Sequence, residues 1–173
     1  KAVFLMLITG KEMALNTTHA LRSLYVTPEG KIAIQGDVAL PLLLSKGFRI
    51  IWQEASPARA ALTLARPGCK CESEKLKLLK AGESCACGQA LADEFTRKEA
   101  DAAGITQGRS GEKYNWKSYP KVMLRWRALL QTARAIAADV LGGIYTEDEI
   151  EEIMERAEKP ERTVASVEVQ AGV

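Results

Sequence analysis

One segment constrains the fold more than any other, because residues 117–141 have the pattern of a long amphipathic helix. At about 100° per residue, its apolar side chains fall in one continuous arc, which is typical of a helix that packs on a core. The arc comprises Val122, Met123, Trp126, Leu129, Leu130, Ala133, Ile136, Ala137 and Leu141. Pro120 is acceptable in the first turn, and Gly142-Gly143 ends the helix. We therefore expect one long helix that begins between Trp116 and Pro120.

Basic residues follow both edges of this arc. Six lie between positions 113 and 134, where the sequence has no acidic residue: Lys113, Lys117, Lys121, Arg125, Arg127 and Arg134. Such side chains can bury their stems and present their charge in a groove, where arginine binds phosphate in a bidentate manner. Trp116 and Tyr119, at the start of the helix, are candidates for stacking on a base or for anchoring the fold.

A block of opposite charge follows, with eight acidic residues between Thr146 and Glu161. Two blocks of opposite charge so close in sequence indicate that the basic block binds a polyanion. The acidic block is then solvated or pairs with another subunit. The alternative is two ordinary solvated helix faces.

The remaining pattern predicts an α+β fold, in which a small antiparallel sheet packs on the long helix. Expected strands are 23–26 and 31–34 (a hairpin, with Lys31 exposed beside its turn), 48–53, 59–65 and 90–95. Expected helices are 3–15, a short one capped by Thr17 or Thr18, 38–46 with Asp37 as cap, 97–103 with Thr96 as cap, and a last one opened by Thr146 and Glu149. Residues 105–115 are expected to form a mobile loop.

Length and composition indicate one domain. The 173 residues are 47% apolar and 27% charged, which suffices for one core over residues 1–159, followed by a flexible tail over 160–173. The sequence starts at Lys1 rather than Met, and we expect it to be a piece of a longer protein. The only continuous apolar run, residues 2–8, is too short to cross a bilayer, so we expect a cytoplasmic protein with no membrane partner.

Two strings resemble a known family. Residues 116–128 read WKSYPKVMLRWRA, and residues 139–146 read DVLGGIYT, with Glu149 following. They resemble W-x-x-Y-P-x-x-M-L-x-x-R-A and D-V-L-x-G-x-Y-T-x-x-E, the signature of the phage RecT and Bet (Redβ-like) single-strand DNA annealing proteins. The resemblance extends over roughly residues 10–150.

Membership in that family implies a Rad52-like annealing fold and a homo-oligomer, as a ring or a filament, with DNA in a basic groove. It implies ATP-independent binding of single-stranded DNA and of the annealed duplex intermediate during homologous recombination. It also implies a phage-encoded protein in the cytoplasm of a bacterial host, with an exonuclease and a host single-strand-binding protein as partners. Of the candidate DNA-binding residues, Arg125, Arg127, Lys117 and Lys121 fall inside the matched motif, whereas Arg134 rests on charge alone. The other candidates are Lys31, Lys113, Trp116 and Tyr119. The cysteine-containing segment is no part of the family pattern, and the family's outer segments are absent or short here.

That segment, residues 66–88, interrupts the strand pattern and holds all four cysteines of the chain. They form two C-x-C pairs: Cys69, Cys71, Cys85 and Cys87. Four thiolates can complete a tetrahedral structural zinc site, although C-x-x-C is the commoner spacing. A free or disulfide-forming set of thiols is the alternative, and a catalytic zinc is disfavoured because no position is left for water.

No catalytic constellation is apparent. His19, the sole histidine, has no acid or nucleophile fixed near it, and the chain has neither G-x-x-x-x-G-K-[ST] nor G-x-G-x-x-G. We therefore expect a protein that is not an enzyme and binds no nucleotide cofactor. A zinc-ribbon-containing interaction protein whose basic helix docks an acidic partner is the main alternative. A metal-dependent nuclease that uses the acidic residues 147–152 ranks last.

Overall fold

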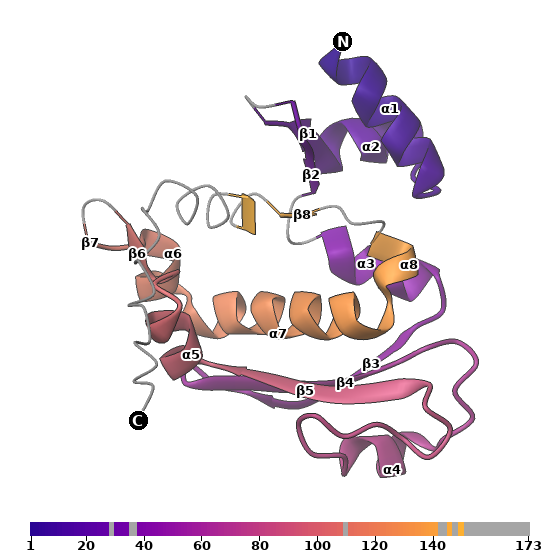
Figure 1. Cartoon of the computed structure of the whole chain (residues 1–173), viewed down its shortest axis with the longest axis vertical. Helices are drawn as coiled ribbons and strands as arrows, with labels where there is room; N and C mark the ends of the chain where they lie inside the picture. The colour runs from indigo at the N-terminus through magenta and orange to yellow at the C-terminus, as the bar shows by residue number, and fades with distance from the viewer. Residues whose placement is uncertain (28–29, 35–37, 109–110, 142–144, 147–148, 151–173) are drawn as a thin grey trace, which may run out of the picture.

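The structure is a computed structural model of the chain, and it describes residues 1–27, 30–34, 38–108, 111–141, 145–146 and 149–150. It has the expected α+β class. Its centre is a three-stranded antiparallel sheet, in the order β3-β4-β5, against which the long helix α7 (Pro120–Ile136) packs. Figure 1 shows α7 between this sheet and the N-terminal elements, with α4 on the far side of the sheet.

The sheet is built from β3 (Arg49–Ala55), β4 (Arg59–Ala65) and β5 (Ala90–Thr96). These bounds agree with the predicted strands to within two residues. β4 is the central strand, and six of its seven residues are buried, on both faces. Ala60, Leu62 and Leu64 belong to the main core. The other face of β4 is covered by residues 66–88, because the Thr63 hydroxyl donates to the Leu76 carbonyl at 2.8 Å and Ala65 packs with Leu76.

The predicted long helix begins within the expected range, at Pro120, but the prediction of its end near Leu141 is wrong, because α7 ends at Ile136. Trp116 lies in a separate short helix, α6 (Tyr114–Ser118), and α7 is followed by α8 (Ala138–Leu141). Tyr119 separates α6 from α7 at φ −132° and ψ 49°, since the residue before Pro120 avoids the helical region. Ala137 separates α7 from α8, also outside helical geometry, at φ −131° and ψ 31°.

An arginine just outside the sheet accounts for the second break. Arg66, the residue after β4, donates from Nη1 to the Ile136 carbonyl at 2.6 Å and pairs with the Asp139 carboxylate. A cation that binds a terminal carbonyl satisfies an acceptor that has no partner inside the helix. Arg66 therefore acts as a C-cap for α7, from a part of the sequence 70 residues away.

The predicted core arc of the long helix is also partly wrong. Val122 is exposed, and Met123, Trp126 and Ile136 are only half-buried. Leu124, Ala128 and Thr132, which lie outside that arc, are buried instead, along with Leu129, Leu130 and Ala133. One core cluster runs from the N-terminal elements through α7 to the sheet. The helix is therefore covered on more than one side, which a single-face wheel does not represent.

The N-terminal elements are α1 (Ala2–Glu12), α2 (Thr17–Ser23), the hairpin of β1 (Leu24–Val26) and β2 (Ile32–Ile34), and α3 (Ala39–Ser45). The hairpin prediction is confirmed by the antiparallel pairing of Leu24 with Ile34. The predicted cap of α2 is wrong, because Asn16 rather than Thr17 or Thr18 accepts from the His19 backbone N–H, at 2.8 Å. The predicted cap Asp37 lies outside the described residues.

Further short elements complete the fold. α5 (Arg97–Ala102) has the predicted Thr96 cap, in a capping box with Glu99. The predicted loop at 105–115 instead holds β6 (Gln107–Gly108) and β7 (Gly111–Glu112), which pair with each other, and the start of α6. β8 (Tyr145–Thr146) pairs in parallel with β2, so Thr146 lies in a strand, and most of the predicted last helix falls outside the described residues. In the described part of the chain, no helix is long and apolar enough to span a membrane.

Candidate metal centre and nucleic-acid surface

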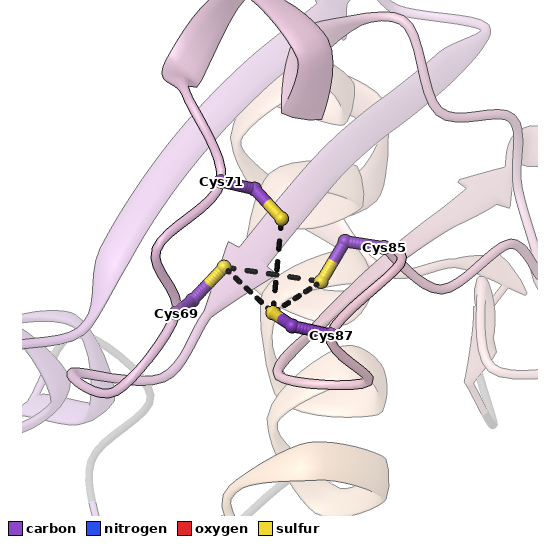
Figure 2. A group of neighbouring side chains, drawn as sticks. All are labelled: Cys69, Cys71, Cys85 and Cys87. Carbon is purple, nitrogen blue, oxygen red and sulfur yellow. Dashed lines mark hydrogen bonds between the residues drawn. The ribbon is translucent and has the colours of Figure 1, made fainter.

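The four cysteines converge in one cluster. Cys69 and Cys71 follow β4, and Cys85 and Cys87 precede β5, so the two adjacent strands bring the pairs together. Figure 2 shows the four sulfur atoms directed toward one another. All four lie within 4.8 Å of each other, with separations of 3.8 Å for Cys69–Cys85, 3.7 Å for Cys71–Cys87 and 3.2 Å for Cys85–Cys87.

These separations fit a metal better than a disulfide. A disulfide needs sulfur atoms about 2.05 Å apart, and all four thiols are free. In a tetrahedral site with Zn–S bonds of about 2.3 Å, the sulfur atoms lie roughly 3.8 Å apart. The cluster therefore has the ligand type, number and spacing that a structural metal requires, and the disulfide alternative has no support in this geometry.

The thiols also affect one another's ionisation. Hydrogen bonding to Cys87, then burial, raises the pKa of Cys71 to about 12. Hydrogen bonds from Cys85 and from the Gln89 backbone lower the pKa of Cys87 to about 6. One thiolate is thus stabilised by protonated neighbours, and a bound cation is what can hold further thiolates so close together.

Residues around the cluster fix its two loops. Arg49, at the start of β3, donates from Nη2 to the carbonyls of Cys69 and Cys71, both at 2.9 Å. Gly88 adopts φ +68° as the chain turns back into β5, and its N–H donates to the Cys85 carbonyl at 2.8 Å. Because backbone bonds and Arg49 hold the loops, the cysteine side chains are oriented by the surrounding protein.

The segment that carries the cysteines also forms a small core. Cys69, Cys85 and Leu76 are buried together with Ala65 and Ala90, and Leu76 belongs to α4 (Ser73–Lys77). Gln53 of β3 donates to the Leu79 carbonyl at 2.7 Å. Residues 66–88, the cysteine module, are therefore packed on the sheet rather than projecting from it.

A second candidate site lies where α6 meets α7. Lys117 and Lys121 are exposed there, and no carboxylate of the described residues pairs with either. Tyr114 and Tyr119 are 70% and 55% exposed, with their rings edge to face and the centroids 6.3 Å apart. We call these four residues the basic corner. It combines unpaired cations with exposed aromatic rings, the two groups that bind single-stranded nucleic acid.

Trp116, a candidate for stacking or for anchoring, lies in the core and is only 2% exposed. The Arg97 guanidinium lies 5.8 Å from the centroid of its ring and donates to its carbonyl at 3.3 Å. Burial of this kind favours the anchoring role, because a base could not reach the ring.

The three arginines of α7 differ from the lysines. Arg125 is half-buried and stacks over Trp52 of β3, 4.5 Å from the ring centroid. Arg134 pairs through two nitrogens with the Glu149 carboxylate and stacks over Tyr145 at 4.5 Å. Arg127 is half-buried and lines a recess together with Arg134 and Glu149. Arg134 is thus neutralised within the chain, and we leave it out of the basic corner.

The last two predicted DNA-binding residues lie elsewhere. Lys113 is half-buried at the start of α6, where its N–H donates to the Thr106 carbonyl at 2.8 Å. Lys31 is exposed beside the β1–β2 turn, as expected, but it lies next to β2, in a different sheet from β3, β4 and β5.

Sequence reasoning missed Arg49, Arg66 and Trp52. Arg49 and Trp52 belong to β3, and Arg66 follows β4; each acts on a segment distant in the chain, so no local pattern marks it. Asp139 was noted only as part of the family motif. Its pairing partner, Arg66, shows that this aspartate stabilises the junction of α7 and α8.

No family model matches this chain, and no curated protein or solved structure matches it either. The resemblance to annealing proteins therefore rests on the two strings of residues described above.

Proposed function

We propose that the chain is an ATP-independent single-strand DNA-binding and annealing protein, and that the basic corner is part of its DNA-binding surface. The observation that carries the proposal is the pair of exposed lysines, Lys117 and Lys121, which have no carboxylate partner among the described residues and lie beside two exposed tyrosines. The same residues lie within or next to the string that resembles the annealing family.

The chemistry of annealing needs only such a surface. Two complementary strands repel each other through their phosphates, and lysines that neutralise these phosphates lower the repulsion. Aromatic rings hold single strands without selecting a sequence, since every base has a face that can stack. Base pairing itself then supplies the driving force, so the protein needs neither a nucleotide nor a nucleophile.

The finer parts of the proposal rest on the resemblance. They are a Rad52-like fold, a ring or filament of protomers, an exonuclease and a host single-strand-binding protein as partners, and a phage-encoded origin in a bacterial cytoplasm. The three-stranded antiparallel sheet with a long helix on one face is compatible with that fold.

We also propose that the cysteine cluster holds one structural zinc ion. Cys69, Cys71, Cys85 and Cys87 would provide all four ligands, so the ion would hold the cysteine module on the sheet and take no part in annealing. Zinc is preferred over other metals because four thiolates in a tetrahedral arrangement are its usual structural set.

The test mixes two complementary oligonucleotides, one with a fluorophore and one with a quencher, with the protein and without ATP. We expect faster annealing, and binding that weakens steeply with salt because phosphate contacts release counterions. Strand cleavage would favour the metal-dependent nuclease. Absence of both annealing and DNA binding would contradict the proposal and favour the interaction protein, for which the cysteine module is the supporting observation.

A further inference from the structure

A small cavity opens beside α7, where this helix passes α3 and β3. It has a volume of about 200 Å³ and is lined by Leu40, Trp52, Val122, Arg125 and Trp126. Val122 is 44% exposed, so the mouth of the cavity reaches the surface. The cavity is smaller than the roughly 300–1,000 Å³ of most pockets for drug-sized ligands, so it has room for little more than one flat ring.

Arg125 is the one charged residue of this lining, and its charge is incompletely compensated. One face of the Trp52 ring carries its guanidinium, 4.5 Å from the centroid. Its Nε is buried and has no hydrogen-bond partner among the residues that the structure describes. A buried cationic N–H without an acceptor costs free energy, and no lining residue carries a carboxylate. The site therefore lacks an acceptor that a ligand can supply.

The position of the cavity connects it to the basic corner. Lys121 precedes Arg125 by four residues in α7, and residues four apart lie one above the other on the same side of a helix. Lys117 lies in α6, before the break at Tyr119. A ligand with a charged group on Lys121 thus reaches the mouth of the cavity with its next unit.

We infer that the cavity binds one unpaired base of a DNA strand whose phosphates lie on Lys117 and Lys121. The aromatic and aliphatic walls accept the flat ring, and Arg125 donates to an oxygen of the same nucleotide. This inference rests on the proposed function, and it gives a physical reason for the protein to bind single strands more tightly than duplexes. A base in a duplex is stacked and paired, and extracting it costs free energy, so the cavity favours single strands and releases its base when that base pairs.

The experiment compares binding of two equally long oligonucleotides, an oligothymidylate and an abasic strand with the same number of phosphates. The wild-type protein is expected to bind oligothymidylate roughly tenfold more tightly, in line with the effect of stacking one base on aromatic side chains. Both ligands are expected to show the same dependence on salt, because their phosphates are the same.

Two variants test whether the cavity causes this preference. Val122→Trp fills the mouth without changing a charge, and Arg125→Lys keeps the charge but loses the planar guanidinium that stacks on Trp52. Both are expected to reduce the preference for oligothymidylate to the part that Tyr114 and Tyr119 supply by stacking. Ile8→Trp, which adds the same bulk at an exposed position of α1, is the control and is expected to keep the preference.

The outcomes separate this inference from the proposed function. If the wild-type protein binds both strands equally and in a salt-dependent way, the cavity does not bind a base, and the proposed annealing function is unaffected. A preference as large in folded Arg125→Lys and Val122→Trp as in the wild type also overturns the inference, and assigns all of the stacking to the exposed tyrosines. Failure to bind either strand overturns the proposed function and the cavity together.

Discussion

The cysteine module and the basic corner differ in whether their polar groups have partners within the described part of the chain. In the module, the four sulfur atoms face one another, Arg49 binds two loop carbonyls, and Gln53 and Thr63 bind two more. At the basic corner, the ammonium groups of Lys117 and Lys121 have no carboxylate partner among the described residues. Groups satisfied within the chain contribute to stability, whereas unpaired charges on a surface are available to a ligand.

The same distinction applies along α7 itself. Arg134 is paired with Glu149, whereas Lys121 is exposed and has no carboxylate partner in the described part of the chain, although both belong to the basic segment of the sequence. Arg125 is intermediate: it is stacked on Trp52, but its buried Nε has no acceptor among the described residues. Charge in the sequence therefore locates the basic segment, and the structure shows which of its cations are paired within the described part of the chain.

The largest effect is expected from loss of a metal ligand in the module. Cys85→Ser should unfold residues 66–88 and uncover the back of β4, while the annealing core persists. We expect a loss of several kcal/mol in the free energy of unfolding, since structural zinc contributes roughly 10–16 kcal/mol to folding in isolated finger peptides. Thermal unfolding and elemental analysis measure the two effects, with about one zinc per wild-type chain expected.

The matched control for this prediction is Leu78→Ser, which changes an exposed residue of the same module and should keep both the metal and the stability. Wild-type protein that contains no metal after purification under reducing conditions would contradict the zinc proposal. The annealing proposal is independent of that result.

A smaller loss of stability is expected from replacing either tryptophan near the basic corner, and the loss should differ between the two. Trp116→Ala should destabilise the protein by about 3–5 kcal/mol, because it leaves a large cavity in the core. Trp126→Ala should cost less, because that side chain is already half-exposed at a cavity. Chemical denaturation measures both free energies, and equal losses would show that the burial of Trp116 does not determine its role.

Removal of the two unpaired lysines should change binding without changing stability. Lys117→Ala/Lys121→Ala is expected to weaken single-strand binding and to reduce the slope of log K against log salt by about 1.4, which corresponds to two phosphate contacts. Lys46→Ala/Lys77→Ala removes the same charge from exposed positions elsewhere and serves as the control. Titrations at several salt concentrations measure the slopes. If both double variants reduced the slope equally, binding would depend on the overall charge of the protein rather than on Lys117 and Lys121.

These contrasts also show what the sequence could predict. The strands of the sheet were located to within two residues, because apolar β-forming runs and turn residues are local signals. The Thr96 cap was found for the same reason. The proximity of the four cysteines followed from their pairing in the sequence, although the packing of their segment over Thr63 and Ala65 did not.

The failures have a common physical cause in contacts between distant parts of the chain. The break at Ala137 lies where Arg66 binds the Ile136 carbonyl. Arg134 is paired with Glu149, and the Arg125 guanidinium lies over the Trp52 ring. Helical periodicity carries no information on these partners, since it describes one element at a time. The wheel therefore indicated a long basic helix, but it could not show the breaks at Tyr119 and Ala137 or which cations are paired in the described part of the chain.

The smallest effect concerns the paired carboxylate at the α7–α8 junction. Hydrogen bonding to Arg66 lowers the pKa of Asp139 below its ordinary range. A carboxylate with a depressed pKa in the folded state adds stability at pH values above its unfolded pKa, about 3.9, and this stability is lost as the pH falls through the folded pKa. The melting temperature of Asp139→Asn should therefore lie slightly below that of the wild type at neutral pH, and the two should converge in acid. Glu12→Gln, which changes an exposed carboxylate at the end of α1, should run parallel to the wild type across this range. A constant difference between Asp139→Asn and the wild type at every pH would mean that the ion pair with Arg66 adds nothing, and that the break after α7 is set by the Arg66 bond to the Ile136 carbonyl alone.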